Sequence, residues 1–549
     1  MKTERVEADV LCVGGGIAGL MAAIRASELG AKVIVAEKGN TARSGEARAG
    51  NDHFWCYIPE VHGTDIESFI QECLLTQLGL FVLGFGPHVL RTWMEKSFDI
   101  VKLWDSWGIP MKYNGRWEFA GHSFPGRLLT HLKYAGQNQK PILTREALRR
   151  GTQIMNRIMV IELLGDSNGV IGALGIDTRE ERLIEFQVKT LFLGTGAVAR
   201  LFPNLTPGLI GNQIRPITLS GDGRAMAYRL GADLADPESL NRHVGPKNFS
   251  RCGQATWVGI LKDGQGKPVG TFVTKPDRKY GDMASEMGKT IPEQYTRSGR
   301  GPVYMDCTEM TAEDYEYMTH WMKHEGMVPI LDHMDEEGMD VRKNPVEFTT
   351  YQMRCGGLIM INTRAETNIK GLYAAGDEAI GAISGAATFG WISGENAANY
   401  AQGIKATDIK KVRAKIDEKK ELFAQLRGRQ DGPDWEETNV ALQQVMYDYC
   451  GSVRYESLLE QGLSHLRRIK DKACNTMMAR NPHELGRCLE TLNLLDLGEL
   501  AFLMASDRKE TRGLHHRPDY PITNPLMSGY HIIQNVQGKP TIWWKDLKR

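Results

Sequence analysis

The chain has 549 residues, enough for several domains, and its 42% apolar and 24% charged content is that of an ordinary globular protein. Lysine plus arginine and aspartate plus glutamate each total 67, so net charge predicts neither nucleic-acid nor membrane-surface binding. The sequence has no apolar run of membrane-span length and no secretory h-region at its start, so we expect a cytoplasmic protein.

The first predicted elements form a βαβ unit. Residues 9–13 predict a buried strand, 17–29 an Ala-rich helix, and 31–38 a second strand that ends in an acid, Glu37. The turn between strand and helix reads GGGIAG, from Gly14 to Gly19. In this context the glycines permit a tight turn, a close backbone approach to a pyrophosphate and close helix packing, while Glu37 is placed to accept ribose hydroxyls. The unit predicts a dinucleotide site.

A polar, Gly-rich stretch follows from Glu37 to Cys56 (EKGNTARSGEARAGNDHFWC). It has neither helical nor strand periodicity, so it predicts a long ordered loop, and such loops near a sheet edge usually bind ligands.

Two later strands indicate FAD as the dinucleotide. LFLGTG at 191–196 resembles the strand that returns beneath the dinucleotide in many flavoproteins, and GLYAAGD at 371–377 resembles the strand whose terminal acid contacts the ribityl chain. We expect Ser384, Gly385 and Ala386 to precede a helix whose N-terminus points at the flavin.

The fold class predicted from this order is α/β (α+β). A Rossmann-like FAD-binding domain is expected in two pieces, with an inserted capping domain and a C-terminal helical domain. The predicted boundaries are 1–238 and 351–407 for the FAD domain, 239–350 for the cap, 408–505 for the helical domain, and 506–549 for an irregular final segment that contacts a partner.

Several motifs keep one order along the chain: GGGIAG, LFLGTG, SGDG at 220–223, GRGPVYMD at 299–306, IKGLYAAGD and RGLHHR at 512–517. In combination they resemble the flavoprotein subunits of succinate dehydrogenase, fumarate reductase, L-aspartate oxidase and adenylylsulfate reductase. The adenylylsulfate reductase alpha subunit is the nearest resemblance, on Arg43-Ser44-Gly45 and Lys140-Pro141-Ile142.

This resemblance, with the motifs, implies a set of cofactor-binding residues: Gly14, Gly16, Ile17, Ala18, Gly19, Glu37, Lys38, Arg43, Ser44, Gly45, Gly50, Val160, Gly194, Thr195, Gly196, Asp222, Asp377 and Ser393.

The positions expected on the substrate side depart from the known branches. The succinate/fumarate branch has a His and an Arg where Gln352 and Thr388 stand here, and the adenylylsulfate branch has an Asn near Trp55. These differences predict a sister enzyme that has the same flavin–iron–sulfur electron route but acts on another small, anionic substrate. The candidate catalytic residues, chosen by location, are Arg354, Gln352, Arg251, His243 and Trp391, with His53 and Trp55 closing the loop.

The chain has nine cysteines and no CxxC motif, so no metal or cluster site is expected in it. The resemblance implies a separate ferredoxin-like iron–sulfur subunit (4Fe–4S) in a hetero-oligomer. Two alternatives stay open: an oxidase that passes electrons to dioxygen, as L-aspartate oxidase does, and an electron-transfer subunit with a vestigial substrate pocket. We expect neither a nucleic-acid partner nor a direct membrane span.

The residue after Arg43-Ser44 yields the first testable prediction. The succinate/fumarate branch has at this position a His that bonds covalently to the flavin, whereas this chain has Gly45, which offers no side chain. We therefore expect acid or denaturant to release all of the FAD into the filtrate, measured by its absorbance. Flavin that stays with the denatured chain would contradict a non-covalent cofactor.

Overall fold

The computed structural model of the chain describes residues 2–74, 86–123, 126–203, 215–247, 256–269, 275–279 and 291–546, with the backbone alone at residues 241 and 352–354. Its main sheet has seven strands in the order β5-β2-β1-β8-β7-β6, and β15 also pairs with β8. The strands are β1 (Lys2–Val13), β2 (Val33–Glu37), β5 (Gln153–Asn156), β6 (Ile158–Asp166), β7 (Gly169–Asp177), β8 (Arg182–Leu193) and β15 (Leu372–Ala374).

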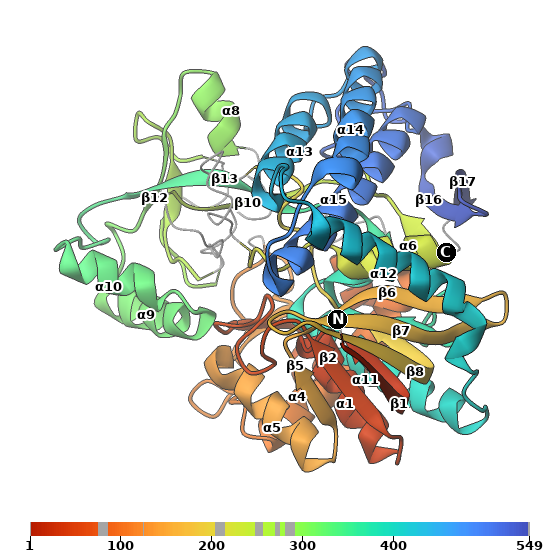
Figure 1. Cartoon of the computed structure of the whole chain (residues 1–549). Coiled ribbons are helices and arrows are strands. Elements are labelled where there is room, and N and C mark those ends of the chain that lie inside the picture. Colours follow the sequence, from red (N-terminus) through yellow and green to blue (C-terminus); the bar gives the residue numbers. More distant parts are fainter. Residues whose placement is uncertain are drawn as a thin grey trace.

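Strands β5, β2, β1, β8 and β15 run parallel, whereas β8, β7 and β6 form an antiparallel meander. Strands β2 and β15 and the last residues of β1 and β8 are buried because helices cover them, which explains their continuous apolar runs. The covering helices α1 (Ile17–Glu28), α4 (Pro87–Ser106), α5 (Gln139–Arg149) and α11 (Ile383–Gln402) lie in the lower part of the molecule in Figure 1, next to β1 and β2. This arrangement confirms the predicted Rossmann-like α/β core.

The inserted segment builds a second sheet with its own core. Its order is β10 (Asn241–Pro246), β13 (Val346–Arg354), β12 (Val303–Asp306) and β11 (Ile260–Lys262). Helices α8 (Ile291–Arg297), α9 (Ala312–Glu325) and α10 (Val328–Glu336) accompany it on one side of the molecule (Figure 1). Buried Trp257, Trp321 and Phe348 belong to this separate core, which holds the sheet as a unit above the main domain.

Four long helices follow along the chain. They are α12 (Arg413–Gly428), α13 (Trp435–Tyr449), α14 (Glu456–Thr476) and α15 (Pro482–Asp507). Ile416, Phe423 and Leu426 of α12 pack on the face of the meander opposite to the Rossmann helices. Helix α13 begins with a capping box made by Asp434 and Glu437, which satisfies its first N–H groups. The remaining elements are α2 (Pro59–His62), α3 (Ile66–Glu72), α6 (Asp222–Leu230), β3 (His53–Trp55), β4 (His131–Lys133), β9 (Leu234–Ala235), β14 (Leu358–Ile359) and the 3₁₀ turns η2 (Gly136–Asn138), η3 (Gly376–Glu378), η4 (Ile409–Val412) and η5 (Pro525–Met527).

The final segment is more regular than expected. Strands β16 (Gly529–Val536) and β17 (Lys539–Asp546) form a hairpin that completes a sheet with β9 and β14. The two loop residues, Gln537 and Gly538, have φ of +52° and +83°, as a tight two-residue hairpin turn requires. The expectation of an irregular C-terminal segment was therefore wrong for residues 529–546, because pairing with each other and with the distant β9 makes them strands although neither alternates between buried and exposed residues.

Helix α11 also differs from its prediction. It begins at Ile383, so Ser384, Gly385 and Ala386 lie within its first turn and do not precede it. Ala382, with φ of +67°, supplies the sharp backbone change that starts the helix.

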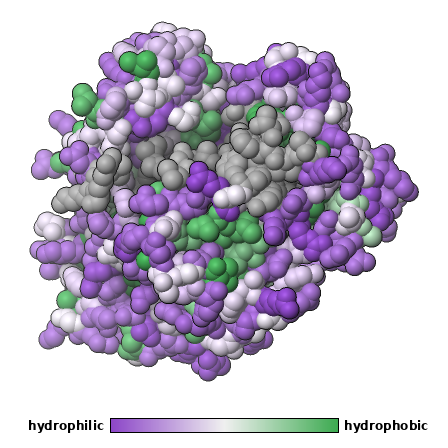
Figure 2. Space-filling model, turned by 180° about the vertical axis from the view of Figure 1, so that it is seen from behind, coloured by the Kyte–Doolittle hydropathy of each residue, from purple (hydrophilic) through white to green (hydrophobic). Residues whose placement is uncertain are grey.

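None of the helices in the described ranges is long and apolar enough to span a bilayer. The face turned away from Figure 1 is mostly hydrophilic, with one apolar area near its centre (Figure 2). The even mixture of charges in the sequence fits this surface.

A buried ionic network joins the hairpin to α15. Arg508 donates to Asp236 at 2.7 Å and to Glu238 at 2.6 Å, and His531 of β16 bonds to Glu238 at 3.1 Å and to Asp507 at 2.8 Å. Burial opposes the charged imidazolium, but Glu238 and Asp507 outweigh it and raise the pKa of His531 to about 9.

This network predicts a pH-dependent stability. Because the pKa of His531 rises from 6.5 to about 9 on folding, its stabilisation of up to about 3 kcal/mol is complete below pH 6.5 and is lost as the pH rises through 9. Urea unfolding should therefore show His531→Gln less stable than wild type at pH 6, with the gap closing by pH 10. A difference in the free energy of unfolding that stays constant with pH would contradict this assignment. The control is His516→Gln, because the side chain of His516 is exposed.

Candidate functional site

Glycine-rich turns meet where the parallel strands end. Gly14 donates its N–H to Ala36 O at 2.8 Å, and Gly194 donates to Val13 O at 2.9 Å. A Cβ on Gly14 would lie 2.4 Å from Gly194 O, and one on Gly19 would lie 1.9 Å from Gly14 O. Only glycine fits at these two positions, so helix α1 begins directly against the turn and aims its free N–H groups past it.

Two buried charged side chains flank this turn. The Glu37 carboxylate accepts hydrogen bonds from the N–H groups of Gly15 and Gly39, both at 2.7 Å. The ammonium of Lys140 donates to Gly15 O. Burial lowers the pKa of Lys140 to about 8, although the negative charge of Glu37 raises it in part. The turn therefore has two charged neighbours. One is the Glu37 carboxylate, which the sequence predicted for the ribose, and the other is the Lys140 ammonium, which contacts the backbone of the turn.

Arg224 of α6 ties three turns together. Its buried guanidinium donates to Gly357 O at 2.7 Å, to Gly196 O at 2.9 Å and to Asp377 O. These carbonyls belong to segments that are far apart in the sequence, so Arg224 fixes the turns after β8 and β15 relative to each other. This residue, which follows directly after SGDG, was not predicted from the sequence.

Thr195 is fixed by the turn after β15. Its backbone N–H donates to the Glu378 carboxylate at 2.9 Å, and its hydroxyl donates to the other oxygen of the same carboxylate at 2.5 Å. Gly194, Thr195, Gly196 and Asp377 are thereby brought together with the turn after β1, as the sequence predicted.

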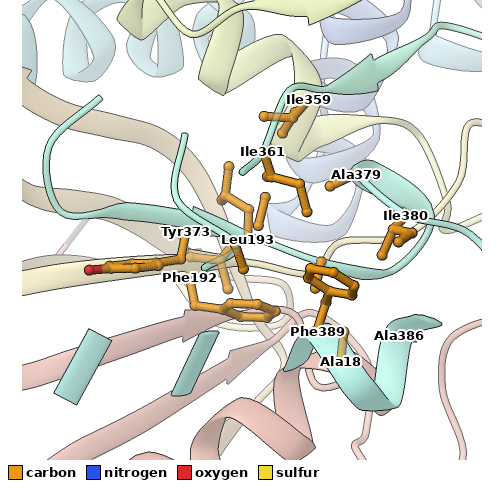
Figure 3. Packing of buried hydrophobic residues seen from close by; sticks show 14 of the residues in the cluster. Ala18, Phe192, Leu193, Ile359, Ile361, Tyr373, Ala379, Ile380, Ala386 and Phe389 are labelled. Carbon is orange, nitrogen blue, oxygen red and sulfur yellow. The ribbon is translucent and has the colours of Figure 1, made fainter. Parts of the chain in front are cut away.

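The start of α11 closes the cradle on its far side. A Cβ on Gly376 would lie 3.3 Å from the Cβ of Ala18 and 3.8 Å from that of Ala386, so α1, α11 and the turn after β15 meet there. Figure 3 shows Ala18, Ala386 and Phe389 packed against one another, with Ile380 close by. We call this surface, from Gly14 to the first turn of α11, the cradle.

Several buried hydroxyls around the cradle lack a hydrogen-bond partner among the described residues. They are Thr41 and Ser44 of the opening loop and Ser384 and Thr388 of α11. Ser384 and Thr388 stand four residues apart and so share one face of the helix. Because buried hydroxyls are almost always hydrogen-bonded, these atoms indicate a polar ligand along the cradle.

A cavity of about 510 Å³ adjoins the cradle on the side of the opening loop. Its wall includes Lys38, Arg43, Ser44 and Gly45, four of the predicted cofactor residues. Lys38 also donates to Asp222 at 2.7 Å. The remaining basic residues of the wall are Arg48, Arg157, Arg179, His483 and Arg487, against one carboxylate, Glu490. This cavity suits the phosphate-bearing half of a dinucleotide.

Beside the cradle, four histidines from separate segments converge. His122 and His131 stack with ring centroids 4.1 Å apart, and His53 lies 4.5 Å from His122 and 5.7 Å from His131. His243 of the cap is close enough to His122 for its charge to influence that ring. We call His53, His122, His131 and His243 the histidine cluster.

Aromatic contacts connect this cluster with the cradle. The ring of His131 stacks on Trp55 at 5.7 Å and an interplanar angle of 7°, and Trp55 meets the edge of Trp93 at 4.7 Å. A Cβ on Gly385, in the first turn of α11, would lie 3.0 Å from the Trp93 ring. The histidine cluster is therefore separated from the start of α11 by two aromatic rings.

Asp52 holds one side of the cluster. Its fully buried carboxylate accepts from His53 Nδ1 at 2.7 Å, from Lys133 Nζ at 2.8 Å and from Thr256 Oγ1 at 3.0 Å. Burial alone would favour the neutral acid, but Lys133 and His53 hold the pKa of Asp52 below its ordinary value. It is therefore a carboxylate at neutral pH.

Two of the histidines are neutral. Burial, reinforced by neighbouring positive charges such as Lys133, lowers the pKa of His122 and of His131 well below the ordinary value. Their imidazoles each present one N–H donor and one acceptor nitrogen.

The cap carries further candidates close to the cluster. In the register of β10 with β13, Tyr351 faces His243, Gln352 faces Arg242 and Arg354 faces Asn241. The backbones of Gln352 and Arg354 are thus near His243, while their side chains and all of Arg251 lie outside the described residues.

Three predicted residues lie apart from the cradle or the cluster. Trp391 packs on α1 and α4, with Arg25 5.0 Å from its ring and Trp107 at 6.3 Å. Gly50 abuts the end of α9, where a Cβ would lie 2.2 Å from His324 O. Ser393 is buried nine residues after Ser384, on the opposite side of α11. Ile17 and Val160 are buried in α1 and β6.

The comparisons with known proteins agree with this geometry. Residues 9–390 match the family described as FAD binding domain, and residues 439–548 match the fumarate reductase flavoprotein C-terminal family.

Among curated relatives, the chain is 25% identical to one subunit of the fumarate reductase (CoM/CoB) of Methanothermobacter marburgensis, over 96% of each chain. It is 24% identical to L-aspartate oxidase of Vibrio cholerae, over 94% of this chain and 96% of that protein. Of solved structures, adenylylsulfate reductase from Archaeoglobus fulgidus superposes with a TM-score of 0.84 at 22% identity, covering 100% of this chain and 97% of that chain. Quinol fumarate reductase from E. coli gives 0.84 at 20% identity, covering 100% and 98%. The expected resemblance is confirmed, and the structures support the shared fold.

The Gly14–Gly19 contact generates a test of the cradle. In Gly19→Ala the added Cβ would meet Gly14 O at 1.9 Å and push α1 from the turn, so we expect the FAD dissociation constant to rise at least tenfold. Fluorescence titration of the apoprotein with FAD measures this. Gly428→Ala is the matched control, because a Cβ there meets nothing within 4 Å. Unchanged FAD binding in Gly19→Ala would contradict the location of the cradle.

Proposed function

Because the chain belongs to the FAD binding domain family and carries a fumarate reductase flavoprotein C-terminal domain, we propose that it is the flavin subunit of an oxidoreductase that uses a small anion. Its electrons pass to an iron–sulfur partner. One observation carries the proposal: a cluster of four histidines, one of them from the cap, lies two aromatic rings away from the start of α11 and the cradle.

Several of the residues present offer groups that suit particular parts of FAD. The turn from Gly14 to Gly19 and the start of α1 would hold the pyrophosphate, and Glu37 would hold the adenosine ribose. Arg43 and the other arginines of the cavity wall would hold the adenosine diphosphate half, and Ser384 and Thr388 offer hydroxyls that lack partners among the described residues. Bound FAD supplies the two-electron chemistry, which can be divided into single-electron transfers.

The histidine cluster supports a small anion as substrate. Neutral His122 and His131 can each direct an N–H donor at a carboxylate or another oxyanion. The nearby carboxylate of Asp52 is already engaged by Lys133, His53 and Thr256. The backbone of Arg354, the residue that the sequence predicted to pair with an anion, lies on the cap strand next to the strand of His243.

An iron–sulfur partner is supported by the family and by the chain's own composition. The sequence has nine cysteines without a CxxC pair, and the eight in the described ranges are free, seven of them buried. Because a reduced flavin can give up its electrons one at a time, a chain of this family that has no cluster motif can deliver them singly to another protein or to dioxygen. We propose the former, with an adenylylsulfate-reductase-like electron route.

Anaerobic flavin spectroscopy tests this function. The FAD-loaded chain is mixed with fumarate, succinate, L-aspartate, sulfite or adenylylsulfate, in its oxidised and its dithionite-reduced form, with and without a 4Fe–4S ferredoxin. We expect at least one anion to reduce or reoxidise the flavin at a rate of turnover, and the ferredoxin to exchange electrons with it.

Two outcomes would overturn the proposal. Peroxide formation in air at the rate of substrate oxidation would assign the chain to the oxidases. Electron exchange with the ferredoxin, but with none of the anions, would make it an electron-transfer subunit with a vestigial pocket.

A further inference from the structure

We propose that His53, oriented by Asp52, is the side chain that exchanges a proton with the substrate at the flavin. This assignment rests on the proposed function. It singles out one member of the histidine cluster, because the four rings differ in their partners, their exposure and their protonation.

The hydrogen bonds of His53 define its tautomer. Nδ1 lies 2.7 Å from Oδ1 of the Asp52 carboxylate, which can only accept, so Nδ1 carries the hydrogen. Among the described residues the ring makes no other hydrogen bond, and Nε2 is left as a base in the neutral ring. A carboxylate behind an imidazole stabilises the imidazolium that forms when Nε2 takes a proton.

Asp52 is suited to orienting a ring and unsuited to reaching a substrate. Its side chain is 0% exposed, and Lys133 and Thr256 hold it from the other side at 2.8 and 3.0 Å. Asp52 is therefore a positioning residue, whereas the ring of His53 keeps 23% of its side-chain surface accessible.

The other histidines are poorer candidates. His122 and His131 are buried, and their lowered pKa values make them weak bases. His243 bonds through Nδ1 to the carbonyl of Val244 at 3.0 Å, and that partner is a neutral dipole. His53, by contrast, has a full negative charge directly behind its ring.

A metal ion is a competing explanation of the same residues. Asp52, His53 and Glu325 bring three ligand atoms within 4.8 Å of one another. The Lys133 ammonium already supplies the positive charge at Asp52, and an additional divalent cation beside it would be repelled. Proton transfer by His53 needs no added ion.

In dehydrogenation of the substrate, a C–H, N–H or O–H bond breaks, its hydrogen moves as a proton to Nε2 of His53, and an N–H bond forms there. The electron pair of the broken bond stays on the substrate as its new double bond, and a hydride leaves from the adjacent atom. Bound FAD would supply the acceptor for the two electrons of this hydride, and His53 would return its proton to solvent. Reduction of a substrate is the reverse.

The test compares wild type with His53→Gln, whose amide can still donate to Asp52 but cannot carry a proton. His465→Gln on the surface of helix α14 is the control, and His243→Gln tests the rival ring. FAD content, dithionite reduction and ferricyanide reoxidation should be unchanged in His53→Gln, because these do not require proton transfer from the substrate. On the anion of the panel that wild type turns over, kcat should fall at least a hundredfold with KM within threefold.

A second readout is independent of turnover. In the FAD-loaded protein, diethyl pyrocarbonate should modify His53, located by mass spectrometry, faster than His122 and His131, because 23% of the His53 side-chain surface is accessible whereas the other two rings are buried. Full activity in His53→Gln, within threefold of wild type, would overturn the assignment, as would a greater loss in His243→Gln than in His53→Gln. If wild type turns over no anion of the panel, the proposed function fails, and the modification rates alone decide whether His53 is the accessible base.

Discussion

The backbone of Gly14 and the backbone of Gly194 touch, and the geometry of the site follows from that contact. Strands β1 and β8 end side by side, and any side chain at Gly14 would drive them apart, since its Cβ would meet a carbonyl oxygen at 2.4 Å. Helix α1 can then begin within contact distance of the same turn because residue 19 is also glycine. With no side chains in the way, the N-terminal N–H groups of α1, the turn after β8 and the turn after β15 surround one space. The cofactor site is thus a consequence of close backbone packing, with charged groups added around it.

Polar anchors then fix the segments that the glycines bring together. Arg224 binds carbonyls of three turns, and Glu378 binds both the N–H and the hydroxyl of Thr195. These buried interactions are satisfied on both sides, so they specify one arrangement of chain segments that are more than one hundred residues apart. The cap is held differently, by its own apolar core and by Thr256, which hydrogen-bonds to Asp52 of the opening loop. One buried carboxylate therefore links the cap, the loop and the histidine cluster.

Part of the site was predictable because local backbone geometry demands particular residues there. The turn from Gly14 to Gly19, the GTG turn and the acid at the end of β2 could be predicted because each rests on neighbours in the chain. The histidine cluster could be predicted only in part: His53 and His243 were candidates by location, whereas His122, His131 and Lys133 were missed. Strand β3 pairs with β4, which lies about eighty residues later in the sequence, and no local sequence pattern predicts that pairing. Trp391, two turns beyond the start of α11, illustrates the opposite error, since proximity in sequence did not bring it to the cluster.

The opening loop now has two functions along its length. Its first half lines the basic cavity, and its end presents Asp52 and His53 to the cap. The most direct measurement is an experimental structure of the FAD-loaded protein with a bound small anion such as sulfite or a dicarboxylate. We expect the anion between the flavin ring and the histidine cluster, with Nε2 of His53 within about 3 Å of it. An anion bound elsewhere, or a flavin whose free face is turned away from His53, His122 and His131, would contradict the proposed site.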